Sequence, residues 1–174
     1  GDFQSNISAN VPTLENALLE YPVFGEGGIV APSLEVLGSD GSNYADLRVV
    51  DYVIHSGKPQ PKGLPSAYAE EGDNVKTLEI KTKDNVSGVE VSLFYAAFYD
   101  YDVITRYAEI TNGGKSDITL LRAFSGNIAF DKNGYEVISN FGTWSRERQI
   151  ERALLLHTGA VVEFVLLKQK SGLV

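Results

Sequence analysis

The spacing of turn residues along this chain limits its fold more than any other feature of the sequence. From Ser33 onward, short runs of alternating apolar and polar residues recur about every ten residues, with Gly, Asn, Asp and Pro between them. The runs are rich in Val, Ile, Thr, Tyr and Phe, and no long apolar pattern has the period of a helix. The sequence therefore predicts an all-β protein built as a large antiparallel β-sandwich, with little helix.

Eight strands are predicted, at residues 34–37, 47–54, 77–82, 89–98, 103–111, 118–125, 127–130 and 135–140. Residues 56–65 contain three prolines and two glycines, so we expect an extended surface loop there. After Arg152 the pattern is ambiguous, because residues 153–156 and 161–167 could each add a strand to the same sandwich.

Size and charge exclude several classes of protein. The 174 residues suit one domain with one core, and no apolar run approaches the roughly 20 residues of a membrane-spanning helix. The net charge of -8, without a basic cluster, argues against a nucleic-acid partner. The chain has no cysteine, which excludes disulfides and favours a cytoplasmic protein. It also has no methionine, even at position 1, so we expect a fragment of a larger protein.

The most distinctive segment is residues 141–148, Phe-Gly-Thr-Trp-Ser-Arg-Glu-Arg, which contains the only tryptophan of the chain. Two interpretations of Trp144 remain open. In the first, the ring packs at the margin of a sheet and its charged neighbours form exposed ion pairs, each worth about 0 to 1 kcal/mol. In the second, the indole is presented at a surface for stacking, which suits ligands with one apolar and one polar face, such as sugars.

The sequence contains no pattern typical of catalysis, metal binding or cofactor binding. His55 and His157 lie far apart, and neither belongs to a motif with metal-ligand spacing, so we expect no metal site. No nucleophile elbow occurs. A mutarotase-like sandwich enzyme would need a histidine and a carboxylate facing one sugar, and neither histidine has an evident acidic partner in the sequence.

A family resemblance rests on seven separated motifs, which occur in order at residues 20–25, 57–68, 77–80, 88–91, 101–106, 120–123 and 142–148. Over residues 13–152 the chain resembles the N-terminal domain of the family 36 glycoside hydrolases, the microbial α-galactosidases. The resemblance implies a sandwich of the galactose mutarotase-like supersandwich type, followed in the whole enzyme by a (β/α)8 barrel and a C-terminal β domain. Residues 1–174 would then be a single N-terminal domain without the catalytic barrel.

The resemblance also implies which residues contact substrate. The catalytic aspartates of the family lie in the barrel, so no catalytic residue is expected in this chain. Trp144 matches the tryptophan of the family motif Gly-Ala-Trp-Ala-Arg-Glu-Arg, which contributes to the galactoside pocket, although Thr143 and Ser145 replace the two alanines. Asp2 falls close to an acidic substrate contact of the family. After Arg152 the chain departs from the family pattern.

The resulting expectation is an accessory domain of a retaining α-galactosidase that hydrolyses terminal α-galactosyl residues in sugars such as melibiose and raffinose. Its expected partners are α-galactosides, the barrel of the same chain and neighbouring subunits of a homotetramer. The alternative is a stand-alone β-sandwich that binds carbohydrate or forms subunit contacts without catalysis.

Overall fold

The computed structural model describes residues 19–25, 31–63, 65–128 and 136–154. Within these ranges the chain contains no helix. Its strands are β1 (Leu34–Gly38), β2 (Leu47–Ser56), β3 (Val75–Asp84), β4 (Val89–Phe98), β5 (Val103–Asn112), β6 (Ile118–Ala123), β7 (Glu136–Thr143) and β8 (Arg146–Leu154).

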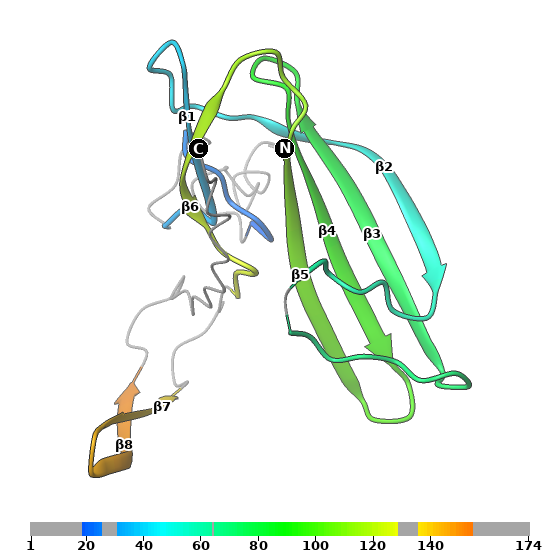
Figure 1. The fold of residues 1–174 in the computed structure, drawn as a ribbon, viewed down its shortest axis with the longest axis vertical. Coiled ribbons are helices and arrows are strands. Elements are labelled where there is room, and N and C mark those ends of the chain that lie inside the picture. Colours follow the sequence, from blue (N-terminus) through cyan, green and yellow to red (C-terminus); the bar gives the residue numbers. More distant parts are fainter. Residues whose placement is uncertain (1–18, 26–30, 64, 129–135, 155–174) are drawn as a thin grey trace, which may run out of the picture.

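The strands form three antiparallel sheets. β2, β3, β4 and β5 make a four-stranded sheet in sequence order, β1 pairs with β6, and β7 pairs with β8. Figure 1 shows the β1–β6 pair beside the four-stranded sheet, while the β7–β8 hairpin stands apart from both. The prediction of an all-β antiparallel sandwich is therefore confirmed.

The main hydrophobic core lies between the four-stranded sheet and the β1–β6 pair. Leu34 and Val36 of β1 pack in one cluster with Val89, Val91 and Leu93 of β4. These residues alternate along their strands, so each strand turns one face to the core. The same cluster includes residues that precede and follow β1, namely Tyr21, Val23 and Ala45.

A second, smaller core lies on the other face of the four-stranded sheet. Ala96 and Phe98 of β4 are buried with Val75 of β3, and Ala69 of the loop after β2 packs against them. Phe94 stacks on Tyr107 of β5, with ring centroids 4.5 Å apart. Strand β4 is thus buried on both faces, on one face along residues 89–93 and on the other along residues 94–98.

One predicted strand is wrong where the structure tests it. Asn127 and Ile128 were expected to begin a strand, but neither lies in one. The side chain of Asn127 donates to the carbonyl of Leu19 at 3.1 Å, and its own carbonyl accepts from Arg106 at 2.7 Å. Asn127 is therefore held by contacts outside a sheet ladder, while its buried side-chain oxygen has no hydrogen-bond partner within the described chain. The remainder of that predicted strand, and the segment 161–167, lie outside the described residues.

The hairpin of β7 and β8 also differs from expectation. β7 extends past the predicted end at Asn140 to Thr143, and β8 begins as early as Arg146. The arginines and glutamates at the start of β8 hide the two-residue period, because both faces of this strand are exposed there.

The described part of the chain has no helix of a length and apolar character suited to crossing a bilayer.

The hydroxyl of Tyr21 fixes the segment before β1 to the end of β6. It donates to the carbonyl of Phe124 at 3.0 Å, and the tyrosine is buried. Burial raises the pKa of Tyr21 to about 12, although the nearby charge of Arg106 opposes the shift. The folded state therefore holds the phenolic proton more tightly than the unfolded chain, whose tyrosines titrate near pH 10.

We predict that Tyr21 makes the fold sensitive to alkali. Its contribution is complete below about pH 10 and is lost as the pH rises to about 12, because the unfolded state then gives up its proton first. Between these values the wild-type protein should lose about 2 to 3 kcal/mol more unfolding free energy than Tyr21→Phe. Urea denaturation of both proteins from pH 8 to 12 measures the difference, and parallel curves would contradict the prediction.

Candidate functional site

Trp144 occupies the tip of the β7–β8 hairpin. Thr143 pairs with Arg146, so Trp144 and Ser145 form the turn between the two strands. Ser145 has a positive φ of 66°, which few residues other than glycine adopt without cost. The side chain of Trp144 is 94% exposed, which makes it the most exposed of the large hydrophobic residues in the described chain.

Gly142 determines how the tip is built. The strand register shifts between Phe141 and Thr143, so Gly142 lies opposite two residues of β8, Glu147 and Arg148, which form a bulge. A Cβ atom at this position would come within 2.9 Å of the carbonyl oxygen of Arg146 and 3.0 Å of Cα of Glu147. These are backbone atoms of the opposite strand, which cannot move aside cheaply. A glycine is therefore required for the close approach that positions Trp144.

An open cleft of about 520 Å³ lies beside the indole. Its lining residues are Asn140, Gly142, Thr143, Trp144, Glu147 and Arg148. The lining combines an aromatic ring with amide, hydroxyl, carboxylate and guanidinium groups, which are donors and acceptors for hydroxyl-rich ligands. The arrangement can stack a sugar ring and hydrogen-bond its hydroxyls, but a single carboxylate beside a guanidinium is not the carboxyl pair of a glycosidase.

The structure bears on the two interpretations of Trp144. The interpretation in which the ring packs at a sheet margin required a ring shielded by neighbouring side chains, and the ring is almost fully exposed. The flanking charges do include an exposed ion pair, between Arg152 and Glu136 at 2.7 Å. Asp2, the other predicted substrate contact, lies outside the described residues, as does His157.

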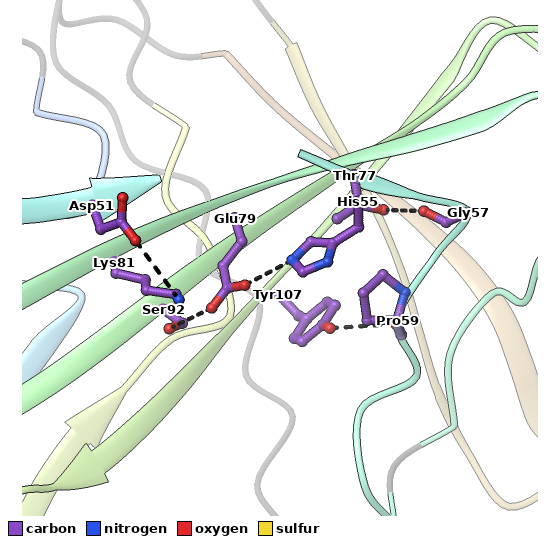
Figure 2. Close-up of polar contacts among 9 residues, drawn as sticks. All are labelled: Asp51, His55, Gly57, Pro59, Thr77, Glu79, Lys81, Ser92 and Tyr107. Atoms are coloured by element: carbon purple, nitrogen blue, oxygen red, sulfur yellow. Dashed lines mark hydrogen bonds and ion pairs between the residues drawn. The ribbon is translucent and has the colours of Figure 1, made fainter. Parts of the chain in front are cut away.

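His55 has an acidic partner, contrary to expectation. Its Nε2 atom lies 2.7 Å from Oε2 of Glu79 on β3, and the hydroxyl of Ser92 donates to the other carboxylate oxygen at 3.1 Å (Figure 2). The sequence could not show this contact, because it depends on register. His55 is paired with Thr77 in the sheet. Glu79 follows Thr77 by two residues on β3, so its side chain lies on the same face as that of His55.

The surroundings of His55 indicate that this cluster holds the loop after β2 against the sheet. Thr77 donates to the carbonyl of Gly57 at 2.7 Å, and the hydroxyl of Tyr107 donates to the carbonyl of Pro59 at 3.3 Å (Figure 2). Burial raises the pKa of Tyr107 to about 12, and the charges of Glu109 and Glu79 add to the shift. His55 and Glu79 line neither the cleft at Trp144 nor the two clefts described below.

A larger cleft of about 720 Å³ runs along β5 beside residues 58–67. Of the three cationic residues that line it, Lys58, Lys62 and Arg106, the first and the last have partners within the chain. Lys58 donates to the hydroxyl of Ser66 at 3.2 Å and lies 5.5 Å from the ring centroid of Tyr107, while Arg106 pairs with Glu20 at 3.1 Å. Among the described residues, no group of His, Asp or Glu side chains is arranged to hold a metal ion.

We predict that fluorescence will report an exposed indole in this 174-residue chain, since Trp144 is its only tryptophan. Acrylamide should quench the folded chain almost as well as free tryptophan. Unfolding in guanidinium chloride should leave the emission maximum nearly unchanged, while the near-ultraviolet circular dichroism of the tyrosines disappears. A folded-state emission shifted to the blue would show a shielded ring instead.

Comparison with known proteins identifies the family. The glycosyl hydrolase family 36 N-terminal domain matches residues 2–163. Alpha-galactosidase AgaA of Geobacillus stearothermophilus is 40% identical over 144 residues, which are 83% of this chain and 20% of that protein. Alpha-galactosidase C of Emericella nidulans is 33% identical over 133 residues, covering 76% of this chain and 18% of that protein.

Solved structures agree with the sequence matches. The crystal structure of AgaA superimposes with a TM-score of 0.79 over 83% of this chain and 20% of that protein, at 40% identity. The α-galactosidase of Lactobacillus brevis gives a TM-score of 0.74 at 32% identity, over 78% of this chain and 18% of that protein. This chain thus spans about a fifth of the length of these relatives. It belongs to the family of N-terminal domains of the family 36 glycosyl hydrolases.

Proposed function

We propose that this domain serves a retaining α-galactosidase, and that Trp144 forms part of the wall of its galactoside pocket. The exposure of Trp144 at the tip of the β7–β8 hairpin carries the proposal. An indole in water loses the favourable free energy of burial, so a ring held there on a turn of fixed geometry is best explained by a partner that covers it. Galactose offers an apolar face of C–H groups for such stacking.

The cleft beside Trp144 supports the same choice of ligand. Asn140, Thr143 and Glu147 surround it with groups that hydrogen-bond to hydroxyls. Crystal structures of AgaA variants hold raffinose and stachyose, so a relative at 40% identity binds α-galactosides. Melibiose and raffinose are the substrates that we infer for the enzyme containing this chain.

The chemical step would belong to another domain. Retention of configuration needs two carboxyl groups about 5 to 5.5 Å apart, one as nucleophile and one as acid and base. The cleft at Trp144 contains the single carboxylate of Glu147, with Arg148 beside it. The role of this chain is then to bind and orient the sugar, so that the carboxyl groups of a catalytic barrel reach the anomeric carbon.

The hairpin also has the features of a contact surface between domains or subunits. Ile138 and Ile150 are 52% and 64% exposed. Ile150 pairs with Asn140, two residues from Ile138, so both isoleucines lie on one face of the hairpin. Such a face would be covered in an assembled enzyme, which supports contact with the barrel or with a neighbouring subunit of a homotetramer. The absence of cysteine supports a cytoplasmic enzyme.

We predict that Trp144→Ala in the intact enzyme lowers kcat/KM for α-galactosides by more than tenfold, because a stacking surface worth about 1.5 to 3 kcal/mol is removed. Trp144→Phe retains a ring and should lose less. Since the side chain is exposed, neither change should alter the unfolding free energy of the domain by more than about 0.5 kcal/mol. Unchanged kinetics in Trp144→Ala would contradict the proposed role.

The alternative is a β-sandwich that binds carbohydrate by itself, or one that only forms subunit contacts, and the exposed Trp144 is compatible with both. Calorimetry of this chain with galactose and raffinose separates them. We expect no binding that depends on Trp144, so Trp144→Ala should leave the titration unchanged, and no hydrolysis of a nitrophenyl α-galactoside, because the pocket needs a wall from another domain. Binding at millimolar concentration or tighter that Trp144→Ala abolishes would favour a stand-alone module, and turnover by the pure chain would defeat the proposal.

A further inference from the structure

A third cleft, here called the tyrosine cleft, lies where the loop before β3 meets the turn between β4 and β5. Its volume is about 490 Å³. Its lining residues are Ala67, Tyr68, Glu70, Asp73, Phe98, Tyr101, Val103 and Thr105. The tyrosine cleft shares no residue with the cleft at Trp144, which lies on the β7–β8 hairpin.

Two of the three aromatic rings that line the tyrosine cleft face solvent. Tyr68 and Tyr101 are each 67% exposed, whereas Phe98, which also lines the cleft, is buried. A tyrosine ring presented at a cleft offers a flat apolar face with a polar hydroxyl at its end. Rings of this kind suit a ligand that is itself apolar on one face and polar at its rim.

Backbone hydrogen bonds hold both ring-bearing segments in place. The amide of Tyr99 donates to the carbonyl of Asn74 at 3.1 Å, which joins the β4–β5 turn to the segment before β3. The amide of Tyr101 donates to the carbonyl of Phe98 at 3.2 Å. Ala69, next to Tyr68, packs against the smaller core. The cleft is therefore formed before any ligand arrives, which lowers the entropy cost of binding.

The charged groups of the tyrosine cleft are carboxylates alone. Glu70 and Asp73 are held by a tight turn, in which the amide of Glu70 donates to Oδ2 of Asp73 at 2.8 Å. Within the described residues neither carboxylate forms an ion pair, and no lysine or arginine lines the cleft. Their free oxygens can accept hydrogen bonds from ligand hydroxyls. An anionic ligand would be repelled.

We propose that the tyrosine cleft binds a neutral hexose unit of an oligosaccharide, as a second carbohydrate contact separate from Trp144. One or both tyrosine rings stack on the C–H face of the sugar, and the carboxylates of Glu70 and Asp73 accept hydrogen bonds from its hydroxyls. The choice of a hexose rests on the proposed function. The shape, exposure and charge of the cleft do not depend on it.

Fluorine NMR of the intact protein labelled with 3-fluorotyrosine tests the proposal. Tyr68→Phe and Tyr101→Phe assign the two signals, and galactose and sucrose are the probes. We expect both signals to shift saturably, with dissociation constants of about 1 to 10 mM. Tyr101→Ala should weaken the response of the Tyr68 signal at least tenfold. Tyr99→Ala is the matched control, because Tyr99 is exposed in the same turn but does not line the cleft.

The outcomes separate this site from the proposed pocket. Trp144→Ala should leave the shifts of the Tyr68 and Tyr101 signals unchanged, so a failure of the Trp144 proposal leaves this result intact. The absence of a saturable shift with both sugars would overturn the inference. An equal loss in Tyr101→Ala and Tyr99→Ala would also overturn it. Two rings beside carboxylates can attract an organic cation, so a response to choline without one to sugars would reassign the cleft and refute the hexose assignment.

Discussion

The burial of β4 on both faces is the constraint on which the rest of this domain depends. Its alternate residues Val89, Val91 and Leu93 pack toward the β1–β6 pair, while Ala96 and Phe98 belong to the smaller core on the other side. A strand used in this way fixes the register of its neighbours, because a slip by one residue would exchange its two faces. Both partners of β4 pair without a bulge along its length.

This fixed register produces the polar contacts of the outer face. Glu79 of β3 lies on the same face of the sheet as His55 of β2 and Ser92 of β4. Its carboxylate therefore contacts both side chains. The same face holds the loop after β2 through backbone carbonyls of Gly57 and Pro59. The position of that loop in turn forms one side of the cleft along β5 and of the tyrosine cleft. The smaller core thus supports the tyrosine cleft, which is the candidate binding surface on this side of the sheet.

The β7–β8 hairpin does not depend on the hydrophobic core for its stability. Its stability comes from the strand pairing and from a turn that needs Gly142, and the described side chains of both strands are exposed. The hairpin, with Trp144 in its turn, projects away from the sandwich (Figure 1). Exposed apolar groups are tolerated at such a site when another surface covers them in the assembled protein. This division, a packed sandwich and a projecting hairpin, matches a domain that supplies one wall of a pocket.

The residues show why some features could be predicted and others could not. Turn chemistry and alternation located β2, β4 and β5, because apolar and β-branched residues recur there with a clear period. The strand predicted at Asn127 is wrong, since the side chain of Asn127 bonds to the carbonyl of Leu19 and its carbonyl accepts from the side chain of Arg106, not from a neighbouring strand. The long β8 was not predicted, because charged residues lie on both of its faces and its sequence does not alternate between apolar and polar residues. The pairing of His55 with Glu79 depends on register, which local sequence does not encode.

Strand propensity, turn residues and motifs are local properties, so the class of fold, the family and the lone tryptophan behind a glycine can be recognised from the sequence. The exposure of the indole of Trp144, the acidic partner of His55 and the two tyrosines at one cleft are visible in the folded chain alone. These are contacts or exposures set by strand register and by the packing of segments far apart in the chain. The contact at His55 and the tyrosine cleft depend on the way β4 is enclosed, whereas the exposure of Trp144 depends on the turn of the β7–β8 hairpin.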